Sequence, residues 1–178
     1  MPKWTVVDTK IAYQSKYMSV FNDTIKLPNK SIISYARVKL KDFCSVLPIT
    51  ENKKIVMIEI YRYPVNYISL EIPSGYVKQG EKPRDCALRE LEEETGYKAR
   101  RLTSFGWFYP WTRSTRRAHL FIAKNLTEGR QKTEPTEQIK IKLLSIEEAR
   151  NKLETGKIKH APTIIALQKF LLTRARAL

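Results

Sequence analysis

The sequence predicts an α+β fold with a small antiparallel β unit at its amino-terminal end. Three observations lead to this expectation. Alternating segments rich in β-branched and aromatic residues recur through the first 144 residues. One helical pattern begins at Pro83 and stops at Gly96, and two more follow residue 144. A chain of 178 residues holds one ordinary domain with a small appendage, and we expect bounds of 1–42 and 43–178.

The amino-terminal unit is expected to be a β hairpin. Met18 to Leu27 and Ser31 to Leu40 both alternate, and Pro28-Asn29-Lys30 between them is a turn signal. Two or three strands by themselves are only marginally stable. The unit must therefore pack on the main domain or on a second subunit.

Strands and helices mix from Phe43 onward. A capping box of Ser145 and Glu148 predicts a helix that ends near Thr155-Gly156, and Pro162 opens a final helix. The expected strands of this part are Cys44 to Ile49, Ile55 to Tyr61, Ile68 to Ile72, Leu102 to Phe108, Ala118 to Lys124 and Ile139 to Leu144.

The chain is strongly basic, with 33 Lys and Arg against 18 Asp and Glu and a formal net charge of +15. This balance favours anionic partners such as nucleotides, polyphosphates or nucleic acid, although a merely lysine-rich surface has the same composition. Cys44 and Cys86 lack the spacing of a disulfide framework or a metal site, and we interpret both as buried apolar residues. The start of the chain has no signal-peptide pattern, and no run of residues is apolar enough to span a membrane. We therefore expect a cytoplasmic protein with no membrane partner.

Acidic residues gather in one place in this basic chain. Glu90, Glu92, Glu93 and Glu94 occupy four of five consecutive positions on the predicted helix, and Glu81 precedes them. Glu90 lies three and four residues before Glu93 and Glu94, so these carboxylates share a helix face and repel one another. A solvated acidic face paired with Arg89 is one interpretation. A bound hard cation is the other, because Mg²⁺ and Mn²⁺ prefer carboxylate oxygens.

The spacing favours the cation. Gly75 to Tyr97 matches G-x5-E-x7-R-E-U-x-E-E-x-G-U, where U is bulky and apolar, and Tyr97 is a mild departure from the usual aliphatic residue. The segment resembles the signature box of the Nudix hydrolases, whose fold is a mixed β-sheet sandwiched between α-helices. Further segments are similar to the ADP-ribose pyrophosphatase branch, namely Tyr61 to Pro64, Glu71 to Gly75, Gly156 to Ile158 and Thr163 to Leu167.

The resemblance implies roles for residues of the box. Glu90 and Glu94 are expected to bind the metal, together with the backbone carbonyl of Ser74, and Glu93 binds the metal or a water on it. Arg89 is expected to orient these carboxylates by charge-assisted hydrogen bonds and to pair with Glu81.

The resemblance also implies residues outside the box. The branch supplies a general base and another metal ligand from an acidic loop, which here contains Glu134 and Glu137, with Pro135 at the usual base position. Glu134, Glu137 or a helix glutamate could therefore act as the base. Arg62, Tyr76 and Pro110 are the expected substrate contacts.

The implied activity is Mg²⁺-dependent hydrolysis of a nucleoside diphosphate linked to another moiety, with ADP-ribose giving AMP and ribose 5-phosphate and Mn²⁺ as a possible substitute. One alternative keeps the chemistry and changes the substrate to nucleoside triphosphates, dinucleoside polyphosphates or capped RNA. A third is a non-catalytic module that binds nucleotides or nucleic acid. The branch forms homodimers through its amino-terminal β unit, so we expect a homodimer that takes a nucleotide-sugar substrate. The net charge of +15 leaves nucleic acid open as a further partner.

Overall fold

The computed structural model describes residues 2–133 and 138–175, and the chain divides into two compact units. The first comprises Met1–Asp42 and Tyr109–Arg117, and the second comprises Phe43–Phe108 and Ala118–Leu178. In the described ranges, no helix is both long enough and apolar enough to pass through a lipid bilayer.

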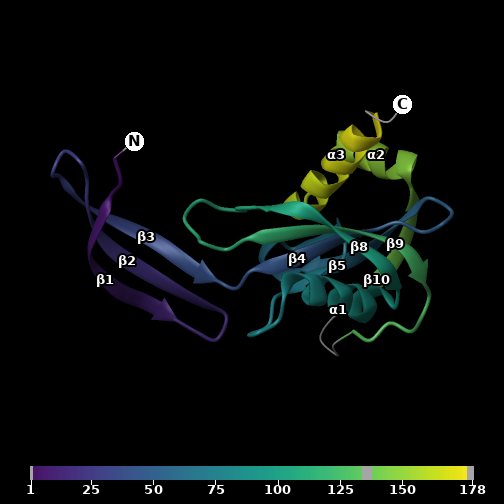
Figure 1. Ribbon diagram of the computed structural model, residues 1–178, viewed down its shortest axis with the longest axis horizontal. Helices are drawn as coiled ribbons and strands as arrows, with labels where there is room; N and C mark the ends of the chain where they lie inside the picture. Colours follow the sequence, from purple (N-terminus) through teal and green to yellow (C-terminus); the bar gives the residue numbers. More distant parts are fainter. Residues whose placement is uncertain (1, 134–137, 176–178) are drawn as a thin grey trace. The chain divides into compact units, whose positions relative to one another are not determined.

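The first unit is a three-stranded antiparallel sheet in the order β1-β2-β3 (Figure 1). Its strands are β1 (Thr5–Gln14), β2 (Met18–Lys26) and β3 (Ile32–Leu40). Strands β2 and β3 were predicted from the sequence, whereas β1 was not predicted as a separate strand. Asp23 on β2 is only 3% exposed. It accepts a 2.8 Å hydrogen bond from Thr9 on β1 and pairs with Arg37 on β3.

The second unit contains two sheets. A four-stranded sheet has the order β7-β4-β9-β8, and a three-stranded sheet has the order β10-β5-β6. The first of them is mixed, because β4 runs parallel to β9 and antiparallel to β7. The strands are β4 (Phe43–Pro48), β5 (Lys54–Arg62), β6 (Tyr67–Glu71), β7 (Ser74–Tyr76), β8 (Lys98–Phe108), β9 (Ala118–Thr127) and β10 (Ile139–Ser145). Six of these were predicted to within a few residues, and the three-residue β7 was missed.

Three α-helices complete the second unit, as the sequence predicted. They are α1 (Pro83–Thr95), α2 (Ile146–Glu154) and α3 (Ala161–Ala175). Pro83 opens α1, and Gly96 ends it with a positive φ of 74°. Ser145 and Glu148 form the expected capping box at the start of α2. A 3-10 turn, Tyr63–Val65, links β5 to β6.

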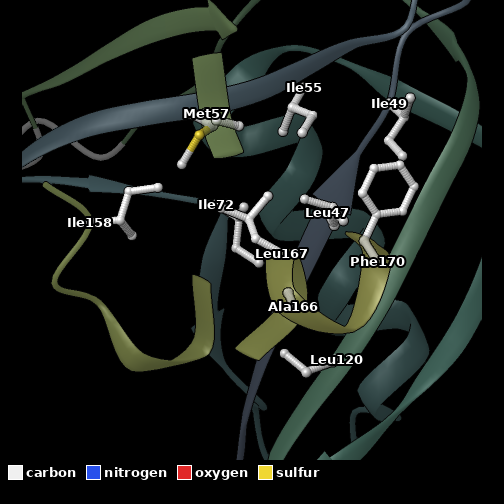
Figure 2. Packing of buried hydrophobic residues seen from close by; sticks show 11 residues of the cluster. Leu47, Ile49, Ile55, Met57, Ile72, Leu120, Ile158, Ala166, Leu167 and Phe170 are labelled. Atoms are coloured by element: carbon white, nitrogen blue, oxygen red, sulfur yellow. The ribbon is translucent and has the colours of Figure 1, made fainter. Parts of the chain in front are cut away.

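The core of this unit consists of two clusters. One lies between the strands and α3, where Leu167 and Phe170 pack beside Leu47, Met57 and Ile72 (Figure 2). The other lies on the α1 side of the strands, where Leu91 packs with Val46, Val56, Phe121 and both cysteines. The helices therefore cover both sides of the strands, with α1 on one side and α2 and α3 on the other (Figure 1).

Helix α1 is held by its apolar stripe. Cys86, Ala87 and Leu91 are fully buried, and Glu94 continues the same stripe three residues after Leu91. A carboxylate at a core position is costly to bury, so the apolar contacts of the helix must hold it there.

We predict that Leu91→Ala lowers the free energy of unfolding by about 2–5 kcal/mol, because it removes a fully buried side chain and leaves a cavity beneath α1. Leu172→Ala on α3 is the matched control. Leu172 is 65% exposed, so its removal should change stability by less than about 0.5 kcal/mol. Urea unfolding followed by circular dichroism measures both, and equal losses would contradict this account of the core.

Candidate active site

Helix α1 carries its carboxylates to the short strand β7. Glu94 is 3% exposed, and its Oε2 accepts a 2.8 Å hydrogen bond from the backbone N–H of Ser74. The carboxylate of Glu90 lies against Gly75, because a Cβ placed on that glycine would be 1.9 Å from Glu90 Oε1. The helix and the strand therefore meet face to face at these two residues.

Gly75 is a glycine for reasons of space. Its φ is not among the positive values found in the described residues, so the backbone conformation does not by itself require a glycine here. Any side chain at this position would instead occupy the place of the Glu90 carboxylate. The first glycine of the box thus allows the carboxylate to approach the strand backbone.

Arg89 joins three acidic side chains. Its Nη1 donates to Glu90 at 2.6 Å and to Glu93 at 2.9 Å, while its Nε donates to Glu81 at 2.8 Å. Its Nη2 also donates to the backbone carbonyl of Tyr76 at 3.1 Å, which ties the guanidinium to β7. The expected Glu81–Arg89 pair is therefore present, and it belongs to a larger network.

The network shifts the pKa values of its members in the direction that favours charge. Hydrogen bonds from Arg89 lower the pKa of Glu81 from 4.5 to about 2, with help from the Lys78 backbone. The same bond with Glu81 raises the pKa of Arg89, and Glu90 and Glu93 contribute to this rise. The guanidinium thus stays charged and keeps Glu81 ionised.

Charge is concentrated at this end of the unit. Glu81, Glu90, Glu93 and Glu94 carry four formal negative charges, and the guanidinium of Arg89 supplies one positive charge among them. Within residues 2–133 and 138–175, no three acidic, histidine or cysteine side chains already surround an ion-sized position. The donor set nevertheless consists of hard oxygens, namely carboxylates and nearby backbone carbonyls, which suit Mg²⁺ or Mn²⁺.

The remaining acidic residue of the run, Glu92, has a different environment. Its carboxylate lies 3.2 Å from Lys132 Nζ and 3.4 Å from Lys98 Nζ. Glu92 faces solvent only in part, because its side chain is 29% exposed, less than the 39% of Glu93.

A second polar network surrounds Arg62. Its Nε and Nη2 donate to the two oxygens of Glu71 at 2.9 and 2.6 Å, and Glu71 is 1% exposed. Burial raises the pKa of Glu71, but the bonds from Arg62 and the proximity of His160 outweigh this effect and the pKa is lowered overall. Arg62 is therefore held in one orientation by a buried carboxylate.

His160 extends this network to α3. Its Nδ1 lies 2.9 Å from the Thr163 hydroxyl, which accepts a 3.0 Å bond from the Ile72 N–H. Burial, the largest influence, lowers the pKa of His160. The same Nδ1 lies 3.4 Å from Glu71, which is 89 positions earlier in the chain, so no local sequence pattern indicates this contact.

The Arg62 network lines a pocket of about 560 Å³ in the second unit. A volume of this size is typical of sites for small organic ligands. The residues around it are Arg62, Val65, Tyr67, Ser69, Glu71, Lys159, His160, Ala161 and Pro162.

The other expected site residues have different positions. Tyr76 lies on β7 with 54% of its surface exposed. Pro110 belongs to Tyr109–Arg117 of the first unit. Glu134 and Glu137, the candidates for a general base and a further metal ligand, lie outside the described residues.

We predict that Glu81→Gln lowers the free energy of unfolding by about 1.5–3 kcal/mol at pH 6, because it removes charge-assisted bonds to Arg89. The pKa of Glu81 is lower in the folded protein, so its contribution is fully present above about pH 4.5 and is lost as the pH falls towards 2. The difference between wild type and variant should therefore shrink on acidification. Urea titrations at pH 6, 4 and 3 test this, with Glu51→Gln in an exposed turn as control, and a difference independent of pH would contradict it.

Comparison with known proteins identifies relatives of this chain. The family profile of the NUDIX domain matches residues 42–167. The ADP-ribose pyrophosphatase of Bacillus subtilis (strain 168) is 31% identical over 92% of this chain and 90% of its own length. A methanol dehydrogenase activator of Bacillus methanolicus is 32% identical over 95% of this chain and 93% of its own length.

A solved structure described as an ADP compounds hydrolase superposes with a TM-score of 0.83 at 20% identity, covering 96% of this chain and 93% of its own. This likeness supports the fold, and the sequence matches support the family. The chain belongs to the Nudix hydrolase family and is similar to its ADP-ribose pyrophosphatases.

Proposed function

We propose that this Nudix hydrolase cleaves the phosphoanhydride of a nucleoside diphosphate linked to a sugar, most specifically ADP-ribose to AMP and ribose 5-phosphate, with the help of Mg²⁺. The observation that carries the proposal is the position of Glu94. A carboxylate that is 3% exposed on the apolar stripe of α1, beside the Glu90 carboxylate at β7, offers the hard oxygen donors that a divalent cation prefers. Similarity to the ADP-ribose pyrophosphatase of B. subtilis supports the substrate.

The residues present suit a hard divalent ion. Glu90 and Glu94 would hold it with the backbone carbonyl of Ser74, and Glu93 stands one helical turn from Glu90 at the more exposed edge. Gly75 leaves the space that the Glu90 carboxylate occupies. When bound, Mg²⁺ or its substitute Mn²⁺ neutralises phosphate charge and lowers the pKa of water.

The chain's own groups have complementary tasks. Arg89 orients Glu90 and Glu93 by its two Nη1 hydrogen bonds and stays charged, while Glu81 holds Arg89 from the other side. Glu93 is the most exposed carboxylate of the network, so it is placed to accept a proton from water or to orient that water. Glu134 and Glu137 remain proposed as the general base and an additional ligand on the resemblance alone.

Arg62 is the proposed contact for the phosphate groups of the substrate. The bidentate pair with Glu71 fixes the plane of its guanidinium beside the pocket of about 560 Å³. A preoriented guanidinium loses little entropy when it binds an oxyanion. Tyr76 and Pro110 are proposed as further substrate contacts, and the exposure of Tyr76 is consistent with stacking on a base.

The substrate is tested with a panel of nucleotides and a chromatographic assay of the products. ADP-ribose should yield AMP and ribose 5-phosphate in the presence of Mg²⁺, and chelation should abolish the reaction. Turnover of nucleoside triphosphates, dinucleoside polyphosphates or capped RNA in place of ADP-ribose would indicate the alternative Nudix substrates. Binding of nucleotides without turnover of any compound would indicate a non-catalytic module.

We predict that Glu94→Gln reduces kcat at least about 100-fold, because it removes one metal-binding charge and leaves the fold intact. Glu147→Gln, on an exposed site of α2 with its side chain 80% exposed, is the matched control and should retain wild-type turnover. Steady-state kinetics and thermal melts of the three proteins provide the measurement. Wild-type turnover by the Glu94 variant would refute the assignment of this ligand.

We also propose that the first unit joins two copies of the chain. Strand β1 is exposed along its whole length and lies at the edge of its sheet, and its large apolar side chains are more than half exposed. These are Val6, Val7, Ile11 and Tyr13, and Trp4, which directly precedes the strand, is also more than half exposed. Exposed apolar residues on an unpaired edge strand are a frequent basis for association.

The dimer predicts a result for Ile11→Glu, which places a charge among these side chains. The mass measured by light scattering should be about twice 20.8 kDa for the wild type and should fall to the monomer value for the variant. Lys10→Glu introduces the same charge from the opposite face of β1 and should remain dimeric. A wild-type protein that is monomeric at all accessible concentrations would end this proposal.

A further inference from the structure

Residues 128–132, called the strap here, lie against the carboxyl end of helix α1. The closest approach is between two glycines, because a Cβ on Gly96 would be 2.7 Å from the Gly129 carbonyl and a Cβ on Gly129 would be 2.8 Å from the Gly96 carbonyl. Backbone therefore packs directly on backbone. The last glycine of the box is required by its positive φ and also by this contact.

The strap satisfies carbonyls that the helix itself leaves open. The Gln131 side-chain amide donates to the backbone carbonyl of Glu94 at 2.7 Å, and the Lys132 N–H donates to the carbonyl of Glu93 at 2.9 Å. The last four carbonyls of any α-helix lack partners within the helix. Here two of them belong to the proposed metal-binding residues.

The strap is itself fixed at two further points. Tyr97, which replaces the usual aliphatic residue of the box, is 8% exposed and donates its hydroxyl hydrogen to Glu128 at 2.9 Å. Gln131 also reaches the carbonyl of Ile139, at the start of β10, at 3.4 Å. One side-chain amide thus connects the end of α1 to the neighbouring sheet.

We infer that Gln131 and Tyr97 are positioning residues, which hold the strap against α1. The strap thereby fixes the position of the Glu93 and Glu94 backbone relative to β7. The inference rests on the proposed metal-dependent function. Neither residue is among the proposed metal ligands or substrate contacts. A carboxylate pair binds a hard cation well only when both groups are held in place, so losing the support should weaken ion binding more than it weakens the fold.

Direct Mn²⁺ binding to the full chain, followed by the electron paramagnetic resonance signal of free Mn²⁺, tests the inference. We expect Gln131→Ala and Tyr97→Phe each to raise the Kd for Mn²⁺ about 10-fold, the lower end of the usual effect of residues that support metal ligands. Gln168→Ala, on an exposed position of α3, should bind Mn²⁺ as the wild type does. The KM for ADP-ribose at saturating Mn²⁺ should remain unchanged in all three.

Gly129→Ala provides an independent variant, because it retains every polar side chain and only pushes the strap away from Gly96. A rise in its Kd for Mn²⁺ supports the inference. Variants that bind Mn²⁺ as tightly as the wild type, or that lose only thermal stability, overturn it. A wild-type protein that binds no Mn²⁺ at all overturns the proposed function as well, so the two failures are distinguishable.

Discussion

The repulsion among carboxylates that share one end of helix α1 is the constraint on which the rest of the structure depends. Two carboxylates about 5 Å apart repel by roughly 3 kcal/mol at an effective dielectric of about 20. The Arg89 guanidinium offsets part of this cost by binding Glu81, Glu90 and Glu93 together. The packing of the helix must offset the remaining cost, and the proposed cation would reduce it further. The carboxylates that would bind the proposed cation therefore destabilise the folded protein by repelling one another.

The packing of α1 explains how the fold tolerates the repulsion among these carboxylates. Leu91 and Cys86 anchor the helix in the core cluster that it shares with Val46 and Phe121, and the N–H of Ser74 stabilises the charge of the buried Glu94. Both ends of the helix are also defined, at Pro83 by its ring and at Gly96 by the strap. The apolar half of the helix holds the acidic half at β7, where the backbone of Gly75 leaves room for a carboxylate.

The segment from Glu71, the last residue of β6, to Ser74, the first residue of β7, links the two polar networks of the second unit. Glu71 binds Arg62, Ile72 donates to Thr163 on α3, and Ser74 donates to Glu94 on α1. Four consecutive residues thus connect the pocket beside Arg62 with the carboxylates of the box.

Local patterns in the sequence determined the α+β class, the three α-helices, most strands and the pairing of Arg89 with Glu93, because capping residues, periodicity and i,i+4 spacing act over short distances. The tertiary structure decided what depends on residues far apart in the chain. It revealed β1 and β7, the Arg62–Glu71–His160 network, and the spatial role of Gly75, whose neighbour Glu90 is 15 positions away. The contact of Gln131 with Glu94 spans 37 positions and has no motif of its own. Such contacts follow from how sheets and helices pack, and no short pattern of residues encodes that packing.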